Sequence, residues 1–228
     1  MRAKLILILL ITILGVHTGF AQFSRPLSVG AGAGATFNFT DLSKTKAHPA
    51  AYIEADYLFT PFISVGIRAE KGKLSGNEYD SEFSNNYYAG NVNGKVRLGQ
   101  LLNDPNNYSY KTLTSDIFST IFSNIYLGAG AGIIKNRISR DISSYYANAI
   151  HNKGGGVAKD RYGYHFVVPL NVGLDVPFGR TLYGPKWAIN LNYQHTLTTN
   201  DNLDGIINGK NDQYGVLSLG IKYALFNK

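Results

Sequence analysis

Apolar and polar residues alternate with a period of two along most of the chain. Between residues 27 and 39 the odd positions hold Leu, Val, Ala, Ala, Ala, Phe and Phe, and the even positions hold Ser, Gly, Gly, Gly, Thr and Asn. Successive side chains of a β-strand point to opposite faces, so this pattern predicts a two-faced strand. Similar alternation predicts further strands over residues 51–59, 63–70, 88–98, 125–133, 164–175, 186–194 and 217–225. The chain is therefore predicted to be all-β with eight strands.

The first strand also contains a match to a nucleotide-binding motif. Gly30, Gly32 and Ala35 fit G-x-G-x-x-G/A, and Glu54 follows about twenty residues later. That motif requires a helix after the glycines, but the residues that follow Gly34 are rich in β-formers. The glycines return in Leu127–Gly132, where Ile133 breaks the motif while the alternation continues. The repeat therefore indicates a strand face and not a phosphate loop.

Two kinds of β-barrel fit this alternation: a soluble lipid carrier and a membrane barrel. Charged residues make up only 16% of the chain, which is low for a soluble surface. The charges within the predicted strands are nearly balanced, and glycines on the same faces suit a narrow lumen. We therefore predict an eight-stranded antiparallel up-and-down transmembrane β-barrel, with ten strands as the alternative. The residues predicted to form a polar network in the lumen are Glu54, Asp56, Arg68, Glu70, Lys95 and Arg97.

The beginning of the chain resembles a secretory signal peptide. Arg2 and Lys4 precede an apolar run over residues 5–14, and Gly19-Phe20-Ala21 supplies small residues for cleavage. The run is short for a membrane anchor helix, which is the alternative. We expect a signal peptide over residues 1–21 and one barrel domain over residues 22–228.

Composition excludes several classes of function. The chain has no Cys, and its histidines are not spaced with each other or with acids as a metal site requires. The formal net charge of +7 is spread along the chain rather than gathered in one run, which argues against nucleic acid as a partner. We therefore expect no cofactor, no metal and no catalytic residues.

Three segments give the chain a family resemblance. Residues 126–132 (YLGAGAG), residues 55–62 (ADYLFTPF) and the C-terminal strand resemble small OmpA/OmpX-like outer-membrane β-barrels, especially those of Bacteroidetes. The last strand resembles the β-signal read by the barrel assembly machinery, although the chain continues for three residues beyond it. The positions that match this signal are Ser218, Gly220, Tyr223 and Leu225. The resemblance implies an outer-membrane location with both termini in the periplasm.

This orientation assigns the connections to the two sides of the membrane. The expected outer loops are 40–49, 72–86, 137–161 and 199–212, and the expected inner turns are 60–61, 100–122 and 177–185. The inner turn 100–122 is unusually long. Within it Ser115 is placed to cap a short helix with an apolar stripe of Ile117, Phe118, Ile121 and Phe122. A flap on the barrel rim, a docking site for a periplasmic partner and an extra hairpin remain open as interpretations.

Three functions are consistent with such a barrel. The leading prediction is a non-enzymatic structural or interaction protein of the envelope, in contact with outer-membrane lipids. The basic residues of the 137–161 loop make lipopolysaccharide phosphate a candidate partner. The alternatives are a narrow channel and a lipid-modifying hydrolase or acyltransferase built on His195 with Thr196, Thr198 or Asp201.

The predicted β-signal can be tested by comparing two changes at the C-terminus. Deletion of Asn227 and Lys228 is expected to be tolerated, because both residues follow the signal. Tyr223→Ala combined with Gly220→Asp is expected to prevent insertion, because the last strand must pair with the first to remove both free edges. The measurement is the amount of heat-modifiable protein in the outer-membrane fraction. Normal insertion of the double variant would show that the signal lies elsewhere.

Overall fold

The computed structural model describes most of the chain after residue 26. The described residues are 27–39, 44–60, 62–78, 81–99, 121–152, 154–158, 162–179, 186–199, 201, 203–207 and 211–225. The predicted signal peptide and the start of the predicted helix at Ser115 lie outside them. Residues 121–123, which include Ile121 and Phe122 of the predicted apolar stripe, are helical.

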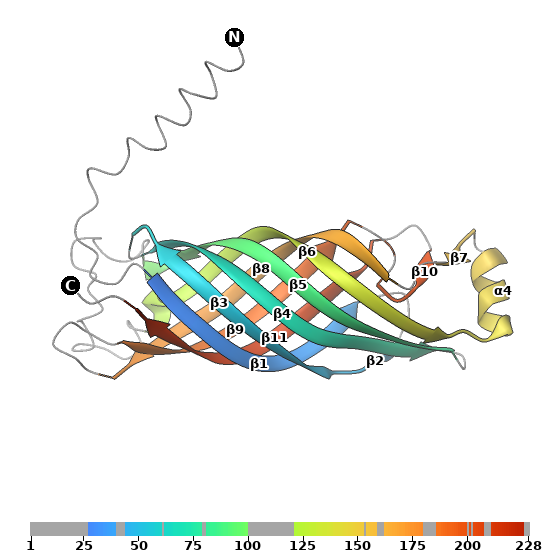
Figure 1. Ribbon diagram of the computed structural model, residues 1–228, viewed down its shortest axis with the longest axis horizontal. Coiled ribbons are helices and arrows are strands. Elements are labelled where there is room, and N and C mark those ends of the chain that lie inside the picture. The colour runs from blue at the N-terminus through green and yellow to red at the C-terminus, as the bar shows by residue number, and fades with distance from the viewer. Residues whose placement is uncertain are drawn as a thin grey trace, which may run out of the picture.

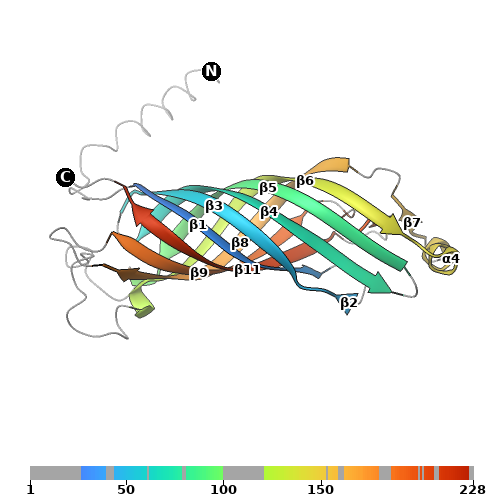
Figure 2. The same cartoon turned by 60° about the horizontal axis from the view of Figure 1, so that its bottom comes forward.

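Eight long antiparallel strands form a closed barrel (Figures 1 and 2). They are β1 (Leu27–Phe39), β3 (His48–Leu58), β4 (Ile63–Glu78), β5 (Ser81–Arg97), β6 (Ile125–Asp141), β8 (Tyr162–Phe178), β9 (Trp187–Thr198) and β11 (Gln213–Ala224). Each strand pairs with its neighbour in the chain, and β1 pairs with β11 to close the ring. This confirms the predicted eight-stranded up-and-down barrel; among the described residues the sheet gains one further strand, the two-residue β2 (Lys44–Thr45).

The two ends of the barrel differ. The end with the first residue of β1 and the last of β11 is called the terminal end, and the opposite end, with the helix α4 (Ser144–Asn152), is called the loop end (Figure 1). Short strands at the loop end are β2 (Lys44–Thr45), which pairs with β4, and β7 (Gly156–Val157), which pairs with β10 (Ile206–Ile207). No helix in the described part of the chain is long and apolar enough to cross a membrane.

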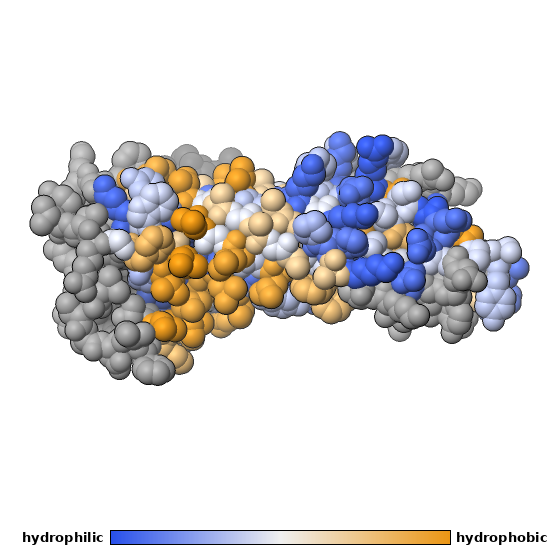
Figure 3. All heavy atoms as spheres, turned by 90° about the horizontal axis from the view of Figure 1, so that it is seen from below, coloured by the Kyte–Doolittle hydropathy of each residue, from blue (hydrophilic) through white to orange (hydrophobic). Residues whose placement is uncertain are grey.

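An apolar belt surrounds the half of the barrel near the terminal end. Its side chains point outward and are strongly exposed; Ile53 and Ile67 are each 63% exposed and Leu219 is 58% exposed. Figure 3 shows this belt beside the terminal end, and hydrophilic residues beyond it toward the loop end. So large an apolar surface on a barrel with a polar interior is the arrangement that a lipid bilayer requires.

The polarity of the wall reverses toward the loop end. There many inward side chains are apolar and form one buried core, whose members include Leu74, Phe83, Tyr87, Ile134, Val167, Leu203, Ile206, Tyr214 and Val216. Buried polar residues, among them Thr36, Asn38, Asn85 and Asn136, also point inward there. The outward positions on the same strands include the exposed Lys71, Asn86, Lys135 and Arg137. This half therefore combines a buried apolar core with a polar surface, as a soluble barrel does.

The reversal explains why the predicted loops 72–86 and 137–161 were wrong in extent. β4 continues to Glu78, β5 begins at Ser81 and β6 continues to Asp141. Alternation persists through these residues, but the outward face becomes polar. The apolar outward face that is typical of a membrane strand therefore ends before the strand does. The strands continue because their inward side chains, such as Leu74 and Phe83, are buried.

Leu191→Arg tests the apolar belt. Leu191 points outward on β9, between Trp187 and Tyr193, and is 46% exposed. An arginine near the bilayer midplane should lower the free energy of unfolding in lipid vesicles by about 2–4 kcal/mol. Asn86→Arg, on the outward face beyond the belt, is the control and should change stability little. Equal effects of the two substitutions would contradict a lipid-facing belt at β9.

Candidate functional site

Charged side chains gather inside the barrel within the half that carries the belt. All six residues predicted for the lumen point inward and are buried, and Asp175 of β8 and Lys222 of β11 join them. The alternation places them there, because each occupies the face opposite the lipid-facing side chains. The eight side chains are four acids and four bases, so the set has no net formal charge. Its members are Glu54, Asp56, Glu70, Asp175, Arg68, Lys95, Arg97 and Lys222.

Two lysines hold a pair of acids on β3. Lys95 Nζ lies 3.0 Å from Glu54 Oε2 and 2.9 Å from Asp56 Oδ1. Lys222 Nζ lies 3.1 Å from Glu54 Oε1 and 3.1 Å from Asp56 Oδ2. Each carboxylate therefore contacts both ammonium groups, which come from opposite sides of the barrel. Such mutual pairing is what makes burial of these charges tolerable.

Asp175 of β8 joins this cluster and brings Arg97 of β5 into it. Its carboxylate lies 3.2 Å from Lys222 Nζ and 2.9 Å from Arg97 Nη2, and it accepts a hydrogen bond of 2.8 Å from Asn190 Nδ2. Lys222 thus contacts three acids and lies at the centre of the six-residue cluster.

Arg68 and Glu70 form a separate pair nearer the loop end. Arg68 Nη2 lies 3.0 Å from Glu70 Oε2, and the Tyr87 hydroxyl donates a 2.6 Å hydrogen bond to Glu70 Oε1. The guanidinium stacks 3.7 Å from the centre of the Tyr52 ring and donates to Ser218 Oγ at 3.4 Å. The ion pair is therefore in contact with two tyrosines and one serine hydroxyl.

Side-chain amides fill the remaining lumen beside the charges. Asn171 Nδ2 donates to Asn93 Oδ1 at 3.1 Å, and Asn192 Nδ2 donates to Asn171 Oδ1 at 3.2 Å. The Tyr126 hydroxyl donates to Asn192 at 3.1 Å and accepts from Asn190 at 2.9 Å. This chain of hydrogen bonds links strands β5, β6, β8 and β9, and it satisfies polar groups that water does not reach.

A lumen tyrosine lies against Gly32, one of the glycines that resembled a nucleotide motif. The ring of Tyr52 lies across Gly32 and Gly220, so a Cβ atom at either glycine would collide with it. The ring of Tyr126 covers Gly173 in the same way. Glycine is therefore needed where an aromatic ring lies flat against the neighbouring strand.

The residues predicted from the sequence are thus divided between two clusters. Glu54 and Asp56 were expected to form one network with Arg68 and Glu70, but their ion-pair partners are Lys95 and Lys222. The contribution of Lys222 and Asp175 was missed from the predicted set, although both lie on the polar faces of their predicted strands. Charge balance could not have found them, because the six predicted residues are three acids and three bases and already sum to zero. The signal that could have found them is their position on the lumen-facing side of the alternation, opposite the outward apolar residues.

The lumen is filled at both ends. Leu203 and Ile206, from the connection between β9 and β11, are buried in the core at the loop end. The Leu203 carbonyl accepts a 2.9 Å hydrogen bond from Asn85 Nδ2, and Gly205 accepts one of 2.9 Å from the Ala158 N–H. At the terminal end, a cavity of about 20 Å³ lies beside Arg97, Asp175 and Lys222. That volume is about one water molecule.

The residues of the predicted β-signal lie along the closing seam. Ser218 and Gly220 face the lumen, and the Tyr223 ring packs on Trp187 with ring centres 4.6 Å apart. The Leu225 N–H donates to the Leu27 carbonyl at 2.8 Å. Because Gly220→Asp would also collide with Tyr52, Tyr223→Ala alone removes the aromatic residue of the signal without that collision in the lumen.

The structure places His195 and the two threonines of the postulated hydrolase on opposite faces of β9. His195 faces outward, whereas Thr196 and Thr198 face the lumen. Its neighbours are the Tyr193 hydroxyl, 3.3 Å from Nδ1, and Gln213 Oε1, 2.8 Å from Nε2. An amide in place of a carboxylate offers no negative charge to stabilise a protonated imidazole. In the described part of the chain, no three His, Cys, Asp or Glu residues are placed to bind a metal.

No family model and no curated protein matches this sequence. Solved structures of small outer-membrane proteins do match. Neisserial surface protein A is 12% identical, with 90% of this chain and all of that chain covered and a TM-score of 0.45. Ail of Yersinia pestis, solved with the heparin analogue sucrose octasulfate, is 13% identical over 88% of this chain and 99% of its own, with a TM-score of 0.47.

The outer membrane enzyme PagL also matches, at 13% identity over 87% of this chain and 99% of its own, with a TM-score of 0.33. At these identities and TM-scores the likeness says nothing about the role of any residue.

A double-mutant cycle tests the Arg68–Glu70 pair. Arg68→Ala should lower the free energy of unfolding by about 3–5 kcal/mol, because it leaves Glu70 buried without its cation. Arg68→Ala with Glu70→Ala should cost less than the sum of the single changes, by about 0.5–3 kcal/mol. The measurement is urea unfolding in lipid vesicles. Glu82→Ala, at an exposed glutamate, is the control, and additive losses would show that the pair is not coupled.

Proposed function

We propose that the protein is a sealed, non-enzymatic barrel of the outer membrane that acts through its surfaces, as a structural or interaction protein of the envelope. The observation that supports this most directly is the interior. A neutral set of paired charges fills the half inside the belt, and an apolar core fills the loop end. Because the interior is occupied in this way, a partner would contact the outer wall of the barrel or its loops.

The proposed orientation has both termini on the periplasmic side. The loop end continues beyond the apolar belt as a wall with a polar exterior, topped by α4 and by the β7–β10 pair. Outer-membrane barrels have longer extracellular structures than periplasmic turns. The proposal therefore places α4 outside the cell, where a protease added to intact cells would reach its connection to β8.

Single-channel recording tests the proposal against the narrow-channel alternative. The purified protein in planar bilayers should show no conductance above the bare membrane, because Lys95, Lys222 and their acids occupy the lumen. Lys222→Gly, which removes the central side chain, is the positive comparison and should raise the frequency of openings. Regular, ion-selective steps from the unaltered protein would overturn the sealed-barrel proposal.

A further inference from the structure

A row of basic and aromatic residues crosses the outer wall directly beyond the apolar belt. Lys71 of β4 pairs across the strands with Tyr88 of β5, Tyr88 pairs with Lys135 of β6, and Lys135 pairs with Tyr164 of β8. All four side chains point outward and are exposed. The lysine ammonium groups lie 5.3 Å from the Tyr88 ring centre and 5.4 Å from the Tyr164 ring centre. The four residues are called the cationic row.

The cationic row carries positive charge that no described acid neutralises. Lys71 and Lys135 form no ion pair with any described carboxylate, and neither does Arg137, which lies one outward position beyond Lys135. Among the described outward positions of β4, β5, β6 and β8, the only acids are Glu82 and Asp141, a cross-strand pair at the far loop end. The row therefore offers cations to an anionic group from outside the protein.

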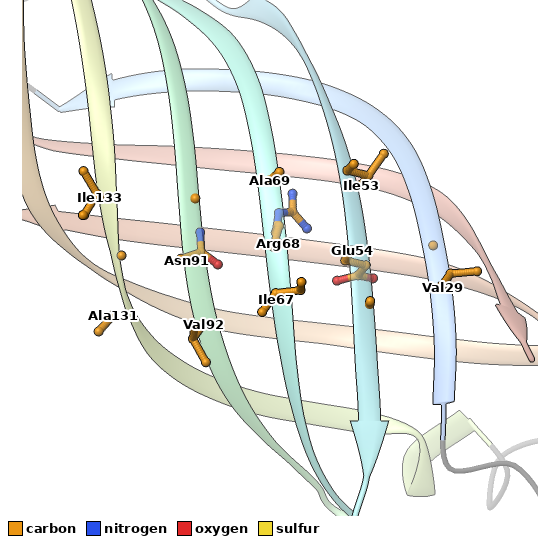
Figure 4. Close-up of a pocket in the computed structure, with 14 residues that line it drawn as sticks. Val29, Ile53, Glu54, Ile67, Arg68, Ala69, Asn91, Val92, Ala131 and Ile133 are labelled. Atoms are coloured by element: carbon orange, nitrogen blue, oxygen red, sulfur yellow. The ribbon is translucent and has the colours of Figure 1, made fainter.

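A hollow with a mainly apolar lining lies in the wall next to the cationic row. Figure 4 shows residues that line it, among them Glu54, Arg68 and Asn91, whose side chains face the lumen. Its volume is about 920 Å³. Its outward-facing lining comes from five neighbouring strands and includes Val29, Ile53, Ile67, Gly90, Val92 and Ile133. Ala69, Gly90 and Ile133 form the cross-strand row immediately before Lys71, Tyr88 and Lys135. Gly90 deepens the hollow, because its Cβ position has no atom within 4 Å.

We infer that the hollow and the cationic row together bind one lipid: a phosphorylated glycolipid with several acyl chains, of the lipid A type. Phosphate would lie on Lys71 and Lys135, and the acyl chains would fill the hollow. Five strands span four spacings of about 4.8 Å, or about 19 Å, which is wide enough for several chains side by side. This inference rests on the proposed outer-membrane location and orientation.

Charge and shape make separate contributions to this site. A basic residue at a membrane surface attracts any anionic headgroup within a Debye length. The hollow adds a requirement for chains that pack against Ile67, Val92 and Ile133. A lipid that satisfies both should bind more tightly than one that supplies phosphate alone.

The experiment measures binding of defined lipids to the refolded full mature chain in detergent micelles by native mass spectrometry. The probes are bis-phosphorylated lipid A, dephosphorylated lipid A and phosphatidylglycerol, with inorganic phosphate as a competitor. Lys71→Gln with Lys135→Gln should weaken lipid A binding about tenfold. Lys46→Gln, an exposed loop-end lysine outside the row, is the control for lost charge and should leave binding unchanged.

Gly90→Leu tests the hollow with little disturbance of the backbone, because a Cβ atom at this position has no protein atom within 4 Å. It should weaken lipid A binding severalfold. Gly94→Leu is the matched control: Gly94 also faces outward on β5, outside the hollow, and its Cβ position meets only the Ala129 carbonyl at 3.9 Å. Heat-modifiable migration verifies that each variant is folded.

Several outcomes would overturn the inference. These are equal lipid A binding by the lysine variant and Lys46→Gln, equal binding by Gly90→Leu and Gly94→Leu, phosphatidylglycerol binding as tight as lipid A, or full displacement by inorganic phosphate. Each of these results is independent of the conductance measurement, so a failed lipid site and a failed sealed barrel can be told apart.

Discussion

The narrow lumen is the constraint on which the rest of this structure depends. An eight-stranded barrel encloses just enough space for side chains, and inside a bilayer a charge there cannot be hydrated at low cost. Every lumen charge therefore needs a partner of opposite sign. The chain meets this need with four acids and four bases, and it places Lys222 where three carboxylates converge. The same shortage of space requires glycine beneath Tyr52 and Tyr126.

The sequence predicted the strands well because alternation is a local property. The pleat alone places Leu27 and Phe39 on one face of the first strand. It also turns Gly30 and Glu54 away from lipid. The partners of Glu54 could not be predicted in this way. Lys95 and Lys222 reach it from two other strands, and which residues meet across the lumen depends on the stagger of all eight strands. A periodicity in one segment contains no information about that stagger.

The loop end was predicted less well for a different physical reason. A strand in lipid shows apolar residues outward, whereas a strand in water shows them inward. β4 passes from the first condition to the second: Ile67 and Ala69 face out, and then Leu74 faces in while Lys71 faces out. The period of two is unchanged, but the apolar residues now point inward and the polar residues point outward. A search for apolar outward residues therefore ends where the strand passes from lipid to water, although the strand itself continues.

This exchange also fixes the depth of the barrel in a membrane. Moving the barrel toward its terminal end would bring Lys71 and Lys135 into hydrocarbon, and moving it the other way would expose Ile67 and Ile133 to water. Both displacements cost free energy, so the boundary between the two wall types is held at the edge of the bilayer. The cationic row lies along that boundary. Its lysines are therefore kept at the level of the lipid headgroups by the same reversal of polarity that lets the strands continue beyond the membrane.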